Sequence, residues 1–164
     1  MSYKPKSLPN GDPIPAIGYG TWAIGGRMQA DSSDDKRSMA GIQAALDAGY
    51  THIDTAEMYA AGHTEELVGQ TIRAARVERE DLFITSKIWP KNLAYGKLQE
   101  ACENSLRRLG IDYLDLYLIH WPGDAPLEES FRALNELQAA GKIRHVGVSN
   151  FDVDLMKQSP VNVN

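Results

Sequence analysis

Short apolar segments typical of strands alternate five times along the chain with longer segments that have the periodicity of helices. The expected strands cover residues 16–20, 51–55, 81–88, 114–121 and 142–148, and they begin about 30 residues apart. Strand-helix units in a row build a parallel sheet, because each helix returns the chain to the same end of the sheet. The sequence therefore predicts an α/β fold, either a (β/α) barrel or a doubly wound sheet. An Asn10-Gly11 pair predicts a short β-hairpin ahead of it.

The helix that the sequence predicts most clearly covers residues 97–110. Its apolar and small residues recur every three or four positions, and Gly110 stops it; they are Leu98, Ala101, Cys102, Ser105, Leu106 and Leu109. On this stripe Cys102 is interpreted as a small core residue rather than a reactive thiol. Other expected helices cover 32–49, 64–75 and 126–141, and a last one starts after Asp152. Their expected caps are Ser32 or Ser33, Thr64 and Asp152.

Composition narrows the class of protein. The chain has 164 residues, of which 43% are hydrophobic and 24% charged, which is enough for one globular domain. The net charge of -5 comes without a basic patch, so neither a nucleic-acid nor a membrane partner is expected. The single cysteine rules out a disulfide framework and favours a reducing compartment. No long apolar run is present, and a cytoplasmic protein is expected.

Polar and aromatic residues gather where the expected strands end. In both candidate architectures ligands bind at the carboxyl ends of the strands. Taken one at a time, Asp54 could cap a turn, Lys87 could reach to water and His120 could be a core histidine. Together they predict one site, since the strand ends deliver all of them to the same rim: Gly20, Thr21, Trp22, Asp54, Tyr59, Lys87, Trp89, His120, Trp121, Ser149 and Asn150.

The first strand contains a formal match to the dinucleotide fingerprint G-x-G-x-x-A, at Gly18–Ala23. A true fingerprint opens a helix, whose first amides meet the pyrophosphate. Here the polar loop IGGRMQADSSD follows instead. We therefore expect these glycines to allow a tight turn and the close approach of a ligand.

The residues at the rim allow a specific chemistry. A free tyrosine has a pKa of about 10, and a neighbouring cation favours its ionised form. Lys87 could supply that charge beside Tyr59, with Asp54 holding the lysine. His120 could orient a carbonyl oxygen, which the phenol would protonate as negative charge develops on it. Such a site lacks a reductant, and a nicotinamide between aromatic walls would supply the hydride.

These segments also carry a resemblance. The motifs GYGTW, HIDTAEMY, ITSKIW, YLDLYLIHWP and GKIRHVGVSNF occur in the order and at the spacing of the aldo-keto reductase family. The resemblance extends over about residues 5–158. It implies a (β/α)8 TIM barrel that reduces aldehydes and ketones with NADPH, usually as a monomer.

The resemblance also implies a role for each matching residue. Asp54, Tyr59, Lys87 and His120 match the catalytic tetrad. The residues that match the cofactor contacts are Gly20, Thr21, Trp22, Asp54, Ser149 and Asn150, the last two of which hold the carboxamide in the family. The residues that match the aromatic substrate wall are Trp22, Trp89 and Trp121, although Trp121 could instead be a core residue. No metal ligand is implied, and His52, His63 and His145 match no catalytic position, so structural roles are expected for them.

The length of the chain departs from that resemblance. A barrel has eight strands and typically about 250 residues, whereas five strands are expected here, with SPVNVN at 159–164 as the start of a sixth. The family's glutamine of strand six, its stacking tyrosine and its 2′-phosphate loop have no counterpart. We therefore expect residues 1–164 to form one incomplete barrel domain whose open edges favour self-association. A preference for NADPH over NADH rests on the family alone.

Other functions stay open at this point. The chain could be an inactive truncated fragment, or a non-enzymatic scaffold that keeps a cofactor-binding barrel. It could also be a lyase that uses Lys87 as a Schiff-base amine, although that role leaves Asp54, Tyr59 and His120 without a shared function. The substrate is open too, and aromatic walls favour aromatic or medium aliphatic aldehydes.

Overall fold

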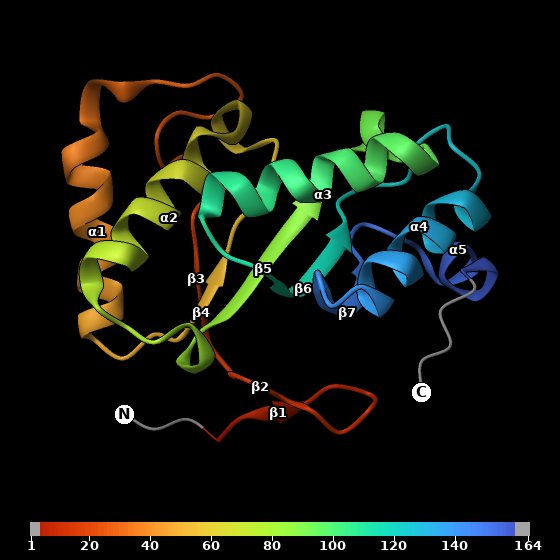
Figure 1. Cartoon of the computed structure of the whole chain (residues 1–164), viewed down its shortest axis with the longest axis horizontal. Coiled ribbons are helices and arrows are strands. Elements are labelled where there is room, and N and C mark those ends of the chain that lie inside the picture. Colours follow the sequence, from red (N-terminus) through yellow and green to blue (C-terminus); the bar gives the residue numbers. More distant parts are fainter. Residues whose placement is uncertain (1–3, 160–164) are drawn as a thin grey trace.

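The computed structural model describes residues 4–159, and its main feature is a sheet of five parallel strands (Figure 1). The strands are hydrogen-bonded in the order β3-β4-β5-β6-β7, which is their order along the chain. A doubly wound sheet reverses its strand order at a switch point, whereas a barrel keeps it. The prediction of a barrel-type α/β fold is therefore confirmed. The strands are β3 (Gly18–Gly20), β4 (His52–Asp54), β5 (Phe83–Ile88), β6 (Leu114–Ile119) and β7 (Ile143–Val148).

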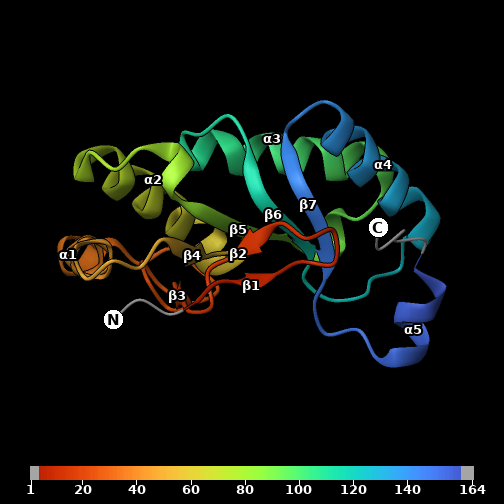
Figure 2. The same cartoon turned by 90° about the horizontal axis from the view of Figure 1, so that it is seen from below.

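A helix follows each strand, and α2, α3 and α4 lie along one face of the sheet (Figure 2). The main core lies between these helices and the strand side chains that face them; among its members are Ile53, Leu67, Ile84, Ile88, Leu98, Tyr117, Ile119 and Leu134. The helices are α1 (Asp35–Asp47), α2 (His63–Ala75), α3 (Tyr95–Leu109), α4 (Leu127–Ala139) and α5 (Val153–Gln158). Among the described residues no helix has the length and apolar character needed to cross a bilayer.

The predicted stripe on α3 is confirmed. All six of its residues are buried, and Gly110 ends the helix in the left-handed conformation with φ of 67°. Cys102 is fully buried, and burial raises the pKa of its thiol to about 12. A thiol with such a pKa is almost entirely protonated at neutral pH, as expected of a core residue.

Two of the expected helix caps are wrong. Asp31, not Ser32 or Ser33, accepts a hydrogen bond from the amide of Ser33 at 3.0 Å, and one turn of 3₁₀-helix precedes α1. Thr64 lies inside α2, and its hydroxyl donates to the carbonyl of Ile24 at 2.6 Å. The cap at Asp31 is local and lies one or two residues before the expected serines, whereas Thr64 bonds to a residue 40 positions away, which local spacing does not reveal. The third cap is correct, since the Asp152 carboxylate accepts from the amide of Leu155 at 2.8 Å.

The predicted hairpin is also present, as β1 (Lys6–Ser7) and β2 (Pro13–Ile14). It lies across the amino ends of the strands (Figures 1 and 2). His145 Nε2 of β7 and Asp12 Oδ2 of the hairpin are 3.3 Å apart, which ties the hairpin to the sheet. The expected start of a sixth strand, at 159–164, lies outside the described residues apart from Ser159.

Candidate active site

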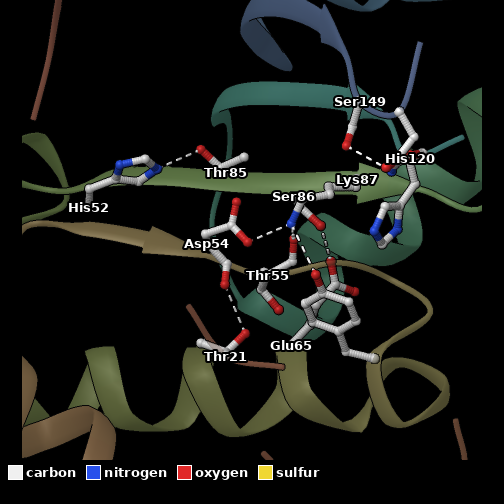
Figure 3. A network of polar contacts seen from close by, with 12 residues as sticks. Thr21, His52, Asp54, Thr55, Glu65, Thr85, Ser86, Lys87, His120 and Ser149 are labelled. Carbon is white, nitrogen blue, oxygen red and sulfur yellow. Dashed lines mark hydrogen bonds and ion pairs between the residues drawn. The ribbon is translucent and has the colours of Figure 1, made fainter. Parts of the chain in front are cut away.

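Lys87 is the centre of the polar contacts at the carboxyl ends of the strands (Figure 3). It is the fifth residue of β5 and only 7% exposed. Its ammonium group donates to Asp54 Oδ1 at 2.5 Å, to the carbonyl of Thr55 at 2.9 Å and to Tyr59 Oη at 3.3 Å. These bonds use all three protons of the ammonium group. Asp54 and Tyr59, predicted from the segment HIDTAEMY, therefore meet Lys87, predicted from the next strand, at one nitrogen.

Tyr59 stands between two aromatic groups. Its ring lies edge-on to Trp22, with centroids 5.0 Å apart, and edge-on to His120, with centroids 5.7 Å apart. The ring of Trp121 stacks on His120 at 3.9 Å. Trp22 and Trp121 remain 49% and 39% exposed. The exposure of Trp121 decides against a core role, and both indoles present an apolar surface beside the phenol.

His120 completes the group of four. Its residue is 4% exposed, and burial, aided by the charge of Lys87, lowers the pKa of the imidazole to about 4. The ring is therefore neutral at physiological pH. Its Nδ1 is buried and has no hydrogen-bond partner in the described structure. A neutral imidazole with one proton can donate a single hydrogen bond to an incoming oxygen.

The predicted residues of the first and last strands reinforce the backbone of this group. The amide and hydroxyl of Thr21 both donate to the carbonyl of Asp54, at 3.0 and 2.9 Å. The Asn150 side chain donates to the carbonyl of His120 at 2.8 Å and to Ser149 Oγ at 3.1 Å. A side chain added at Gly20 would meet no atom within 4 Å, so the end of β3 borders open space.

Trp89 has different surroundings from the other two tryptophans. Its ring lies under the ammonium group of Lys91, which is 3.6 Å from the ring centroid. Its amide donates to Glu57 Oε1 at 2.5 Å, and the side chain of Asn92 donates to the same oxygen at 3.0 Å. The structure therefore places Trp89 in the loop after β5, held by Glu57.

Sequence reasoning missed Glu57 and Glu65, which are both buried. Burial raises the pKa of the Glu57 carboxyl. Through its bond to the amide of Trp89, the Glu57 side chain joins the loop after β4 to the loop after β5. A usable signal existed for each. Glu57 lies between the predicted acid and the predicted phenol, and Glu65 is three residues before Val68, on the apolar face of α2.

The three remaining histidines have structural partners. His52 bonds to Thr85 Oγ1 at 2.9 Å, and burial lowers its pKa. His63 lies 3.0 Å from carboxylate oxygens of Asp35 and Glu66, and the bond to Glu66 raises its pKa. His145 pairs with the hairpin. Among residues 4–159 no three His, Cys, Asp or Glu side chains form a group that could hold a metal ion.

Comparison with known proteins agrees with this geometry. The model of the "Aldo/keto reductase family" matches residues 16–160. The chain belongs to the aldo-keto reductase family. The resemblance inferred from the motifs is confirmed, and the matched region holds all the residues of the tetrad.

Curated relatives and solved structures give the same family. The chain is 46% identical over 145 residues to methylglyoxal reductase YeaE of Escherichia coli, covering 88% of this chain and 49% of that protein. It is 43% identical over 151 residues to glyoxal reductase of Bacillus subtilis, covering 92% of this chain and 51% of that protein. The crystal structure of the thermostable aldo-keto reductase Tm1743 with the inhibitor epalrestat superposes with a TM-score of 0.92 at 49% identity, covering 96% and 57%. The crystal structure of the Klebsiella pneumoniae aldo-keto reductase with NADPH superposes with a TM-score of 0.83 at 44% identity, covering 96% of this chain and 53% of that chain.

The chain spans about half the length of the curated relatives that it matches. The matched half includes the five strands of the sheet and the residues gathered around Lys87.

Proposed function

We propose that the protein reduces the carbonyl group of small aldehydes and ketones, with Tyr59 as the proton donor. The observation that carries the proposal is the position of the Tyr59 hydroxyl, 3.3 Å from the ammonium group of Lys87, which in turn is 2.5 Å from Asp54. A cation beside a phenol favours its ionised form, and so makes the phenol a better acid. Asp54 holds the lysine in place.

His120 and Tyr59 together receive the substrate oxygen. The neutral imidazole donates a hydrogen bond that orients the carbonyl, and the phenol proton moves to the oxygen as negative charge develops there. Lys87 then stabilises the phenolate that remains until a proton from solvent restores it. The nearby charge of Lys87 contributes to the neutral state of the imidazole, since it lowers the pKa of His120 further.

The cofactor in this proposal is NADPH, with NADH as the alternative. A bound nicotinamide supplies the hydride that adds to the carbonyl carbon. Ser149 and Asn150, beside the carbonyl of His120, are the groups proposed to hold its carboxamide, and Gly20, Thr21, Trp22 and Asp54 are proposed to border it. The open space at Gly20 and the exposed face of Trp22 fit a flat ring. The Klebsiella pneumoniae neighbour, which was crystallised with NADPH, supports that choice.

The proposed substrates are small carbonyl compounds. Two relatives are named for methylglyoxal and glyoxal, which are short aldehydes. Trp22 and Trp121, with Trp89 in the neighbouring loop, offer an apolar wall that would also accept an aromatic or aliphatic aldehyde. We further propose a cytoplasmic protein in which residues 1–164 form one barrel-type domain. Self-association through the edge strands β3 and β7 stays a prediction, which sedimentation at several concentrations would test.

The Schiff-base alternative is less well supported. A Schiff base forms when a neutral lysine amine attacks a carbonyl carbon. The three bonds of the Lys87 ammonium group, to Asp54, Thr55 and Tyr59, leave no lone pair for such an attack. A scaffold function would need none of these contacts, so it gains no support from them.

The test compares the protein with its Tyr59→Phe variant, by the rate at which NADPH is consumed with methylglyoxal and with benzaldehyde. We expect kcat to fall about 10²–10⁴-fold in the variant, since the phenol supplies general acid catalysis. The dissociation constant of NADPH should stay within about twofold, because the ring is kept. Equal turnover by both proteins would contradict the role of Tyr59, and no turnover by the unchanged protein with any carbonyl would contradict the proposed reaction.

A further inference from the structure

A buried ion pair lies behind the site, on the helix side of β5. Glu65, in the first turn of α2, has no exposed surface. Its Oε2 is 2.7 Å from Nε and 2.6 Å from a terminal nitrogen of Arg108, which comes from α3. Its Oε1 accepts a hydrogen bond from the hydroxyl of Ser86 at 2.6 Å (Figure 3). A carboxylate without solvent contact is thus bound on both of its oxygens.

Cohesion alone does not explain this arrangement. Buried ion pairs are costly to desolvate, and apolar residues of similar volume often serve stability equally well. Unlike an apolar side chain, the carboxylate makes a directional hydrogen bond. Its bond to Ser86 fixes α2 at one position along β5. Ser86 immediately precedes Lys87, and successive strand side chains point to opposite faces of a sheet. Glu65 therefore holds the strand from behind at the level where Lys87 projects into the site.

The same carboxylate lies close in sequence to Tyr59. Only a short turn separates the phenol from α2, and this turn is left-handed at three successive residues, Ala60, Ala61 and Gly62, with φ of 50°, 55° and 97°. Alanine rarely adopts this conformation. The amide of Ala60 donates to the carbonyl of Arg27 at 2.5 Å, so contacts outside the turn impose its shape.

Gly62 links the turn to the ion pair. A Cβ atom at this position would lie 2.8 Å from both Cδ and Nε of Arg108. The arginine side chain therefore passes through the space that a side chain at residue 62 would occupy. The left-handed turn after Tyr59 and the buried pair behind Lys87 are therefore one connected unit.

We propose that Glu65, held by Arg108, is a positioning residue that sets the turn of Tyr59 against the strand of Lys87 through Ser86. It does so without contacting either reacting group, and the separation that it controls is the 3.3 Å between Tyr59 Oη and Lys87 Nζ. This inference rests on the proposed function for its effect on turnover, but not for its effect on the turn.

The test uses a matched pair of variants, Ser86→Ala and Ser105→Ala. Both serines are fully buried and both belong to the same polar cluster, since Ser105 Oγ accepts from Arg108 at 3.1 Å. Each variant removes one hydroxyl, but only Ser86 joins the cluster to β5. The two measurements are kcat for carbonyl reduction and the rate of amide hydrogen exchange at residues 59–62, with global unfolding measured alongside.

For Ser86→Ala we expect kcat to fall about ten- to a hundredfold, because small displacements of reacting groups are costly. The affinity for NADPH should stay within about twofold, and exchange in the turn should accelerate about tenfold or more. Ser105→Ala should leave both quantities near those of the unchanged protein. Ser86→Thr, which keeps the hydroxyl, should restore the slow exchange and serves if the alanine variant fails to fold.

Equal effects of the two alanine variants, or unchanged exchange in the turn of Ser86→Ala, would overturn the inference. The exchange measurement needs no turnover, so it decides the point even if the proposed reaction is wrong. If instead exchange accelerates as expected while Tyr59→Phe retains full activity, the positioning of the turn stands and the proposed reaction fails.

Discussion

The two ends of the parallel strands each carry a cluster of charged side chains, and the clusters are built differently. At the amino ends Asp115, 2% exposed, accepts from Arg79 at 2.6 Å, from the amide of Ile84 at 2.8 Å and from Arg144 at 3.1 Å. The two guanidinium groups lie 4.0 and 4.1 Å from the centroid of the Tyr113 ring.

At the carboxyl ends the charged groups are fewer, and their carboxylate is more exposed to solvent. The side chain of Asp54 is 35% exposed, and His120 Nδ1 is buried without a partner. The amino-end cluster ties together the starts of β5, β6 and β7, and its carboxylate is bonded on both oxygens. Within residues 4–159 both clusters hold buried polar atoms without a partner, Arg79 Nε and Tyr113 Oη at the amino ends and His120 Nδ1 at the carboxyl ends. The two ends differ in exposure, because solvent or a ligand can reach the carboxylate of Asp54 but not that of Asp115. The contrast teaches that one end of the sheet contributes to stability and the other is available for chemistry.

The largest expected effect is on activity at the carboxyl end. Lys87→Met removes the charge beside Tyr59, so kcat should fall about 10²–10⁴-fold in the assay with NADPH. The free energy of unfolding should change by less than about 1 kcal/mol, since Asp54 keeps access to water and a buried ammonium group is removed. A variant that loses stability but keeps its turnover would break the comparison.

The fold at the carboxyl ends of the strands was largely predictable from the sequence, but the hydrogen bonds that hold the site residues in place were not. The meeting of Asp54, Lys87 and His120 follows from the rule that parallel strands end at one rim, and the barrel-type strand order was implied by the family resemblance. The bonds of Thr21 to Asp54, and of Glu65 to Ser86, join segments 33 and 21 residues apart in the chain. Local periodicity holds no information on which distant group a buried side chain will meet.

The left-handed turn after Tyr59 was unpredictable for a related reason. Ala60 and Ala61 have no intrinsic preference for positive φ, so only contacts such as the bond of Ala60 to Arg27 could impose it. In contrast, Gly110 ends α3 as expected, because glycine itself favours that conformation.

The next effect is on stability at the amino end. Asp115→Asn leaves Arg79 without its carboxylate partner at a buried position, and removing one member of such a pair costs about 3–5 kcal/mol. We expect urea unfolding to show a loss of this size. Below the unfolding transition the variant should retain the kcat of the unchanged protein. A large drop in kcat for the folded variant would show that the two ends are not separable.

A smaller effect concerns pH. The pKa of His120 is about 4 in the folded protein against 6.5 for an ordinary histidine. Between these values the unfolded chain binds a proton that the folded chain refuses, so His120 makes stability fall as pH decreases from about 6.5 to 4. His120→Gln should lose stability less steeply over this window. Urea titrations at intervals of pH would measure both slopes, and identical slopes would contradict a depressed pKa.

The smallest effect is expected at Cys102, in the core between the two ends. With a pKa of about 12, only about one thiol in 10⁴ is ionised at pH 8, and the side chain is fully buried. Iodoacetamide should leave the folded protein unmodified and fully active, and should react once urea unfolds it. Modification of the folded protein would place the thiol nearer to solvent than the packing of α3 allows.

The measurement that tests the division between the two ends most directly is a crossed comparison of Tyr59→Phe and Asp115→Asn. For each variant, kcat and the free energy of unfolding are determined on the same preparation. The account predicts that Tyr59→Phe loses turnover and keeps its stability, whereas Asp115→Asn loses stability and keeps its turnover while folded. Losses of both quantities in both variants would contradict it, because the carboxyl and amino ends would then depend on each other.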